Sequence, residues 1–370
     1  MNIELIHLKG FKSAASIRFE NAAPFAVLAG ANGAGKSNLA DGLAFFGAVI
    51  KRGAVQAIRD YGGYAHIHCF KHRKEAARVA SLALKITLQD KHYDYQITIY
   101  QMDKTPQLTE KLIVDGQIEF ERERGKPFVR VVGPIEVNSG ADFPEEMSTL
   151  LFMGRSPLYQ FLTNIKVFRF DPLSAKEPAG SSTDGTMLDS HGRNVATMLS
   201  VLEKNPEFRE QVLEWIELLV PGMEGVSTKK QRLDGSTVIT FKEEGTKARF
   251  PARLISDGTI YALCIMTAIL SRSSEPGLTL IEEPERGIHP KGIAELVSLM
   301  RENAQVEHPV FVTTHSESVV RSIDSQALWL VNKVDGKTQL KNAAKSAVDL
   351  GELNLDTAWL MNFFDGGLPW

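Results

Sequence analysis

The segment Gly30–Ser37, with the sequence Gly-Ala-Asn-Gly-Ala-Gly-Lys-Ser, restricts the fold more than any other feature of the chain. It fits the pattern G-x-x-x-x-G-K-[ST], in which backbone N–H groups and a lysine surround phosphate oxygens. The motif requires a strand before it and a helix after it. The apolar run Phe25–Ala29 predicts a buried parallel strand, and Asn38–Ile50 predicts a helix with Leu39 and Phe46 on one face. This setting favours a P-loop over a glycine-rich turn without a ligand.

Composition narrows the class of protein. The chain has 370 residues, of which 43% are hydrophobic and 24% are charged, as in soluble globular proteins. Its two cysteines form no disulfide framework and fit a reducing cytoplasm. The longest apolar run, Tyr261–Leu270, is too short to span a bilayer, and Met1–Leu5 resembles a first strand more than a signal peptide. A net charge of -3 means that any nucleic-acid contact must come from a local patch. We expect a cytoplasmic protein with no membrane association.

Two acidic residues follow a second short apolar run. Leu278–Ile281 predicts a buried strand, and Glu282 and Glu283 stand at its carboxyl end. Ligands of open α/β sheets bind at that end of the strands. We expect Glu282, through water, and the Ser37 hydroxyl to hold Mg²⁺, and Glu283 to orient or deprotonate an attacking water. The alternative is a solvated acidic turn, which the preceding apolar strand disfavours.

Two further segments supply groups for a γ-phosphate. The apolar run Val310–Thr313 precedes His315, which can hydrogen-bond the γ-phosphate or the attacking water. Ser256 predicts the N-cap of a helix that continues through Ile269, and Gly258 lies in its first turn. A capped helix start also suits a phosphate, and we expect it to act in trans on ATP held by another subunit. The capping role holds whether or not a phosphate binds.

The remaining predicted positions lie in the P-loop. Lys36 is expected to reach the β- and γ-phosphates. The predicted cofactors are therefore ATP and Mg²⁺. The predicted catalytic residues are Lys36, Ser256, Glu283 and His315. The predicted nucleotide-binding residues include Lys36, Ser256, Gly258 and His315. The others all lie in or directly after the P-loop: Gly30, Asn32, Gly33, Ala34, Gly35, Ser37 and Asn38.

Periodicity outlines the rest of the chain. Val79–Thr87 and Tyr93–Tyr100 alternate apolar and polar residues and predict antiparallel strands, and Asp115-Gly116 predicts a hairpin. Lys166–Phe170 predicts a short strand, and Ala175–Asp189 an exposed loop. We expect one α/β head with four parts: a lobe with the P-loop and an antiparallel sheet at 1–135, an inserted helical and hairpin region at 136–250, a C-terminal lobe at 251–345, and a tail at 346–370.

These segments together resemble the heads of the RecF, OLD and SMC group of ABC-type ATPases, and among them the stand-alone ATPases of the AAA family. The resemblance rests on Gly30–Ser37, on Leu254–Thr259 and on Leu280–Pro290, which contains Glu-Glu-Pro-Glu-Arg. Leu8–Ser13 and Phe168–Pro172 extend it over nearly the whole chain. It implies a P-loop NTPase fold of the ABC head type. It also implies that Ser256 and Gly258 act as the signature motif of these ATPases. Glu285–His289 would form a loop that crosses a dimer interface.

The chain departs from the pattern of the group in two places. Glu282 stands where many ABC proteins have aspartate, although paired glutamates are usual in this subgroup. The glutamine loop has no clear position, and Gln160 and Gln101 are its weak candidates. The sequence contains no sustained heptads, which disfavours an SMC-like clamp, and it ends too soon after its last head strand for a C-terminal nuclease domain like that of OLD proteins.

The resemblance implies an ATP-hydrolysing subunit that forms a homodimer, or a higher even oligomer, around ATP and Mg²⁺. Such proteins serve as motors or sensors in anti-phage defence or DNA repair, often with a separately encoded, nuclease-like effector. A nucleotide-gated scaffold with little turnover is the competing interpretation. A transporter ATPase is a third, which the subgroup motifs disfavour.

Several weaker patterns favour structural interpretations. Trp329–Asp335 contains Asn-Lys-Val-Asp, the guanine-reading pattern of GTPases, but Asp335-Gly336 predicts a hairpin. The tail from Trp359 to Trp370 is expected to pack on the head. The basic clusters Lys71–Lys74 and Lys229–Arg232 are expected to be solvated surface. We expect His66 and His68 to share one face of a strand, with Cys69 on the other. Together with His72 these residues match no common zinc pattern.

Overall fold

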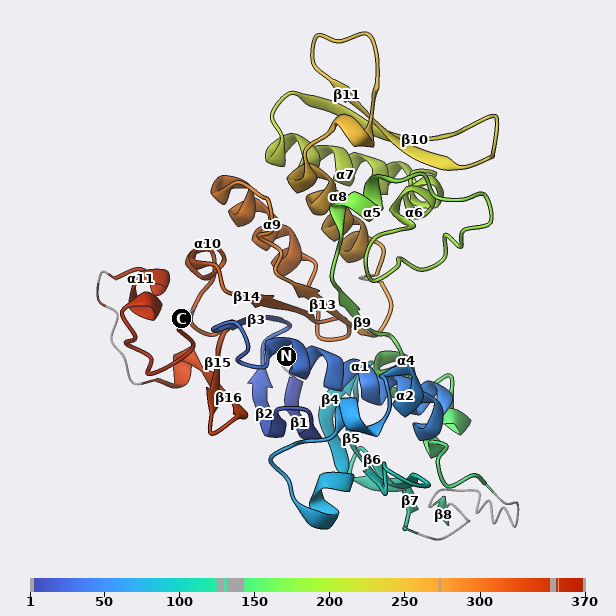
Figure 1. The fold of residues 1–370 in the computed structure, drawn as a ribbon, viewed down its shortest axis with the longest axis vertical. Coiled ribbons are helices and arrows are strands. Elements are labelled where there is room, and N and C mark those ends of the chain that lie inside the picture. Colours follow the sequence, from blue (N-terminus) through green and yellow to red (C-terminus); the bar gives the residue numbers. More distant parts are fainter. Residues whose placement is uncertain are drawn as a thin grey trace.

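The computed structural model describes residues 3–124, 130–131, 143–272, 274–346, 351 and 353–368. Two sheets dominate the lower part of the molecule in Figure 1, and a helical region with a small hairpin extends from them along the long axis. Among the described helices, none has the length and apolar character needed to cross a membrane.

The central sheet is mostly parallel. In the described residues its strands run in the order β16-β15-β3-β14-β13-β9, and only β15 and β16 pair antiparallel within it. The strands are β3 (Phe25–Ala29), β9 (Ile165–Phe168), β13 (Leu278–Glu282), β14 (Val310–Thr314), β15 (Leu328–Val334) and β16 (Lys337–Asn342). Every residue of β3 and β14 is buried, which confirms the buried strands predicted from their apolar runs.

The second sheet is antiparallel, in the order β2-β1-β4-β5-β6-β7-β8 over the described residues. Burial alternates residue by residue along β4, as the sequence predicted. Asp115 and Gly116 both have positive φ, 50° and 80°, which the predicted hairpin turn requires. The strands are β1 (Ile3–Phe11), β2 (Ala14–Ala22), β4 (Ala80–Leu88), β5 (Lys91–Tyr100), β6 (Gln107–Val114), β7 (Gln117–Arg122) and β8 (Arg130–Val131).

Helix α1 (Lys36–Arg52) lies between the two sheets, with Leu39, Leu43 and Phe46 buried in a core shared with both. The helices beside it are α2 (Ala54–Asp60), α3 (Tyr64–Ile67) and α4 (Pro157–Thr163). His66 lies in α3 and His68 directly after it, so the expected strand at this position is wrong. Among the described residues, no group of histidine, cysteine and acidic side chains is arranged to hold a metal ion.

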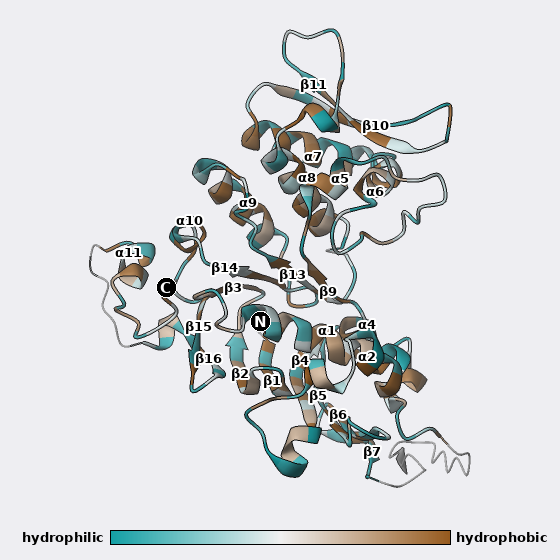
Figure 2. Cartoon of the chain, viewed as in Figure 1, coloured by the Kyte–Doolittle hydropathy of each residue, from teal (hydrophilic) through white to brown (hydrophobic). Residues whose placement is uncertain are grey.

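The helical region packs around α8 (Asp257–Leu270), which is buried from Thr259 to Ile269 and is mostly brown in Figure 2. Ser256 caps it as predicted. The predicted hairpin around Gly235 is present, and residue 179 of the expected loop forms a bridge to its second strand. Surrounding elements are α5 (Pro172–Lys176), α6 (Val195–Leu202), α7 (Pro206–Leu219), β10 (Met223–Lys230), β11 (Thr237–Glu243), β12 (Phe250–Pro251) and α9 (Pro290–Glu302). Short 3-10 turns occur at Lys74–Arg78, Thr149–Met153, Ala252–Leu254 and Ala343–Lys345.

The C-terminal segment packs on the head, as expected. Trp359 of α11 (Leu355–Leu360) is fully buried beside α10 (Glu317–Arg321), and its indole N–H donates to the Gly367 carbonyl at 2.6 Å. Trp370 lies outside the described residues. Asp335 and Gly336, with φ of 50° and 72°, join β15 to β16, so the guanine-reading pattern lies in the predicted hairpin. The division of the chain at 136–250 remains a prediction, and β9 from within it pairs with β13 of the central sheet.

Candidate functional site

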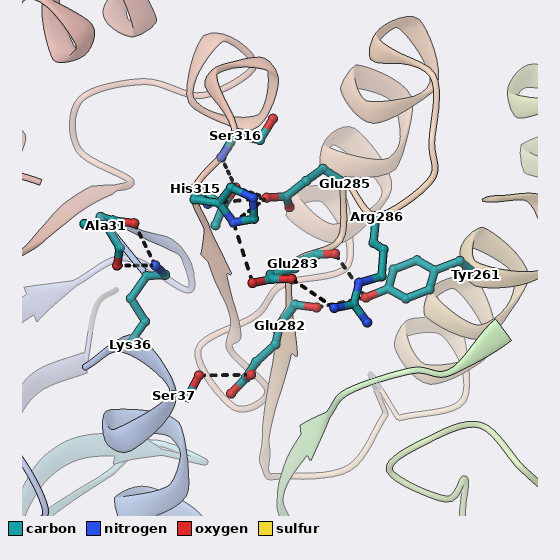
Figure 3. A network of polar contacts seen from close by, with 12 residues as sticks. Ala31, Lys36, Ser37, Tyr261, Glu282, Glu283, Glu285, Arg286, His315 and Ser316 are labelled. Atoms are coloured by element: carbon teal, nitrogen blue, oxygen red, sulfur yellow. Dashed lines mark hydrogen bonds and ion pairs between the residues drawn. The ribbon is translucent and has the colours of Figure 1, made fainter. Parts of the chain in front are cut away.

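The carboxyl ends of β3, β14 and β13 meet at one edge of the central sheet, which we call the acidic edge (Figure 3). Register explains the meeting, because Ala29 pairs with Thr314 and Glu282 pairs with Thr313. Residues that follow these strands are therefore neighbours in space although they lie far apart in sequence.

The P-loop follows β3 and turns directly into α1. Gly35 caps α1 with φ of 106°, and a Cβ there would lie 2.0 Å from the Thr338 hydroxyl, so only glycine fits. The Lys36 ammonium donates to the carbonyls of Gly30 at 2.7 Å and Ala31 at 3.0 Å. Burial lowers the pKa of Lys36, while the carboxylates of the acidic edge act to raise it. The lysine is thus a partly desolvated cation folded back onto its own loop.

The rest of the loop is held from outside. Asn38 donates to the Ser13 hydroxyl at 2.7 Å, and the Thr338 hydroxyl donates to the Ala34 carbonyl at 2.9 Å. Asn32 and Gly33 line a cavity of about 500 Å³ together with residues of β15 and of the C-terminal segment. Contacts from two distant parts of the chain therefore fix the shape of the loop.

Glu282 joins the P-loop helix to the acidic edge. The Ser37 hydroxyl donates to its carboxylate at 3.1 Å, and the Arg169 guanidinium donates to the other carboxylate oxygen at 2.8 Å. Arg169 also donates to Asp41 of α1 at 2.7 Å. Burial opposes the charge of Arg169, but its bonds to Glu282 and Asp41 raise its pKa above the ordinary value. A hydroxyl and a carboxylate in contact are the oxygen ligands that Mg²⁺ prefers.

Glu283 adopts a backbone conformation that is rare for its residue type. Its φ is 51°, and its N–H donates to the Thr313 carbonyl at 2.8 Å. The Tyr261 hydroxyl, within 3.0 Å of the carbonyls of both Glu282 and Glu283, steadies the turn. Left-handed residues other than glycine concentrate at functional sites. The turn directs the Glu283 carboxylate into the acidic edge, between His315 and Arg286 (Figure 3).

The contacts of that carboxylate are long. Its oxygens lie 3.6 Å from the His315 Nδ1 and 3.5 Å from the Arg286 guanidinium. Both distances exceed those of a normal charge-assisted hydrogen bond. The surroundings of Glu283 therefore hold its carboxylate in place but do not use up its capacity to accept hydrogen bonds.

A third carboxylate, Glu285, lies behind His315. It accepts from the Thr314 hydroxyl at 2.7 Å and from the His315 N–H at 3.3 Å. Burial raises its pKa, against the opposing effect of these hydrogen bonds. Its second oxygen has no partner among the described residues.

Ser256 and Gly258 sit apart from the P-loop. The Ser256 hydroxyl accepts from the Thr259 N–H at 3.2 Å, and a Cβ on Gly258 would lie 2.1 Å from the Gly287 carbonyl. No hydrogen bond or ion pair between described residues joins either residue to Gly30–Ser37. The start of α8 thus packs on the turn that follows the acidic pair. Among the described residues, no polar contact of Ser256 or Gly258 connects it to the P-loop of its own chain.

The structure brings together Lys36, Ser37, Glu282, Glu283 and His315, and keeps Ser256 and Gly258 outside that group. Gln160, on α4, and Gln101, after β5 in the antiparallel sheet, do not lie at the acidic edge. Arg169 instead follows β9, the strand beside β13. Sequence reasoning gave Arg169 no role, although a charge directly after a short apolar strand is the same signal that identified Glu282.

Comparisons with known proteins agree with this architecture. Residues 149–321, which include the acidic pair, Ser256 and His315 but not the P-loop, match a family described as "AAA domain, putative AbiEii toxin, Type IV TA system". The chain is similar to an SMC head bound to the C-winged helix domain of ScpA, with a TM-score of 0.60 and 16% identity over 92% of this chain and 98% of that one.

Two further solved structures are similar. The SMC head domain from Thermotoga maritima matches with a TM-score of 0.51 and 14% identity, over 92% of this chain and 99% of that one. An Smc head domain with an extended coiled coil, bound to the C-terminal domain of ScpA derived from Pyrococcus furiosus, matches with a TM-score of 0.50 and 16% identity, over 97% and 98%. The predicted fold class, a P-loop NTPase with the ABC-type head architecture, is confirmed.

Proposed function

We propose that the chain binds ATP with Mg²⁺ at the acidic edge and hydrolyses it there. The observation that carries this proposal is the contact between Ser37 and Glu282 at 3.1 Å, because it joins the P-loop helix to the acidic strand end, 245 positions away in the sequence. Similarity to SMC heads and to an AAA domain family supports the same class of chemistry.

Each side chain then has a role that follows from its position. Lys36 leaves the carbonyls of Gly30 and Ala31 for the β- and γ-phosphates, and the loop N–H groups bind the remaining phosphate oxygens. Ser37 and Glu282 would hold Mg²⁺, which would supply charge neutralisation at the phosphates. The unsaturated carboxylate of Glu283 accepts a proton from the attacking water, and His315 donates a hydrogen bond to the γ-phosphate.

We further propose that two chains close over the nucleotide, with Ser256 and Gly258 of one chain facing the P-loop of the other. This is supported by the separation of the α8 start from its own P-loop and by the N-cap at Ser256, because the positive potential of a helix N-terminus suits a phosphate. Two of the similar SMC heads are bound to domains of ScpA. By analogy, this chain works with a separately encoded partner, which we propose to be a nuclease-like effector in anti-phage defence or DNA repair.

The test is the specific rate of Mg²⁺-dependent ATP hydrolysis across a range of protein concentrations over which light scattering shows monomers without nucleotide. The proposal predicts a specific rate that rises with concentration and is lost when EDTA removes Mg²⁺. ATP binding with negligible turnover at every concentration would favour the nucleotide-gated scaffold. No ATP binding at all would overturn the proposal.

A further inference from the structure

Helix α1 lies beside the edge strand β9 (Figure 1), and their side chains line a cleft next to the acidic edge. It has a volume of about 380 Å³, and we call it the α1–β9 cleft. Helix α1 contributes residues spaced to share one face, among them Asp41, Lys51 and Arg52. The strand and its carboxyl end contribute Lys166 and Arg169. Arg169 thus lines the cleft and also contacts Glu282 at the acidic edge.

The cleft holds more positive than negative charge. Its cations are Lys51, Arg52, Lys166 and Arg169, and the acid that lines it is Asp41. Asp41 is already paired with Arg169 at 2.7 Å and with Lys12 at 2.6 Å. Arg52 pairs with Asp60 at 2.7 Å. In the part of the chain that the structure describes, the side-chain ammonium groups of Lys51 and Lys166 have no hydrogen bond or ion pair.

Lys166 is the group that most needs a counter-charge. It is only partly exposed, at the wall between this cleft and a second one lined by residues 178–194. Burial lowers its pKa, and the nearby charges of Arg272, Lys51 and Arg52 lower it further, whereas the smaller effect of the Asp189 carboxylate is to raise it. Holding an unpaired ammonium beside other cations is unfavourable, and an anion in the cleft would relieve that cost.

We propose that the α1–β9 cleft binds a phosphate group, carried by a small molecule or by the end of a nucleic-acid strand. Lysine and arginine side chains that converge on one cavity suit a multiply charged anion with several acceptor oxygens. The volume falls within the usual range of small-ligand pockets, about 300–1,000 Å³. The site is separate from the P-loop, because none of the residues Gly30–Ser37 lines it.

The test uses inorganic pyrophosphate as the probe and a Lys36→Ala background, which removes the P-loop lysine and makes the result independent of ATP hydrolysis. Titration calorimetry should show pyrophosphate binding to Lys36→Ala. Adding Lys166→Ala should weaken it roughly ten- to a hundred-fold, the loss expected for one charge-assisted contact. Adding Lys51→Ala, an exposed position with little effect on folding, should weaken it in the same direction.

The matched control adds Lys230→Ala, an exposed lysine of β10 outside the cleft, and should leave the affinity unchanged. Absence of pyrophosphate binding in the Lys36→Ala protein, or equal affinity in all four proteins, would overturn the proposal. A second arm compares 5′-phosphorylated with 5′-hydroxyl oligothymidylate. A preference for the phosphorylated strand that Lys166→Ala removes assigns the site to strand ends. Pyrophosphate binding without that preference assigns it to a small phosphorylated molecule.

Discussion

The two sheets of this protein place their polar residues differently. In the central sheet, β3 and β14 are buried along their whole length, and functional polar groups appear only where these two strands end. In the antiparallel sheet, β4 and β6 alternate buried and partly exposed residues, so polar groups are spread along one face. A strand buried on both faces tolerates charge only at its ends. Because those ends meet at one edge, their charges are concentrated there.

Carboxylates in the two regions also differ. Glu110 in the antiparallel sheet accepts three hydrogen bonds of 2.6 Å, from Tyr95, Ser148 and the Thr149 N–H. The carboxylate of Glu283 at the acidic edge is partly exposed, and among the described residues it has only the two long contacts with His315 and Arg286. A saturated carboxylate stabilises the fold, whereas an unsaturated one is free to act on a ligand.

The largest effect is expected from Lys36→Ala. Removing the cation that faces the phosphates should abolish measurable ATP binding and lower hydrolysis at least ~10²–10³-fold, the range for losing one electrostatic stabiliser. Lys85→Ala is the matched control in the antiparallel sheet, where Lys85 pairs with Asp94 at 2.7 Å. It should leave both quantities unchanged. Normal ATP affinity of Lys36→Ala in a binding titration would refute the P-loop assignment.

Glu283→Gln should retain ATP binding and lose hydrolysis by roughly 10²–10⁴-fold, as for removal of a general base. It should also accumulate an ATP-bound dimer that light scattering detects. Glu121→Gln, on an exposed pair with Lys111 in the antiparallel sheet, is the control and should hydrolyse ATP normally. Unimpaired turnover by Glu283→Gln would move the base elsewhere, with Glu282 the next candidate.

Glu110→Gln should behave in the opposite way to Glu283→Gln. An amide cannot accept all three donors, so the free energy of unfolding in urea should fall by about 1–3 kcal/mol. The turnover number of the folded variant should not change. A large loss of turnover with unchanged stability would mean that the contrast between saturated and unsaturated carboxylates is wrong.

The smallest effect concerns pH and Glu285. Because burial raises the pKa of this carboxyl in the folded state, its favourable contribution to folding is complete below its ordinary value of 4.5 and is lost as pH rises through the raised value. Glu285→Gln cannot ionise. Its stability relative to the wild type should therefore improve as pH rises from 4.5 through the raised value, as measured by urea unfolding at several pH values. A difference that stays constant with pH would contradict the assigned environment of Glu285.

Much of the acidic edge could be predicted because its parts are local patterns. A short apolar strand followed by a glycine-rich turn, or by two acids, is visible in a few consecutive residues. The contacts that complete the edge are not local. Arg169 reaches Glu282 only because β9 pairs with β13, and Tyr261 supports the acidic turn through backbone carbonyls that carry no sequence signal. His66 and His68 were assigned to a strand, but the chain forms a helical turn at Tyr64–Ile67 directly after Gly63.

The central claim is that one complete site takes its P-loop from one chain and its signature residues from another. Ser256→Arg should block the signature but leave that chain's own P-loop intact, whereas Lys36→Ala should do the reverse. Each variant alone should be inactive. Mixing them should restore part of the Mg²⁺-dependent ATP hydrolysis, since the mixed dimer contains one intact P-loop facing one intact signature. No restoration, together with a wild-type specific rate that does not depend on protein concentration, would contradict the account.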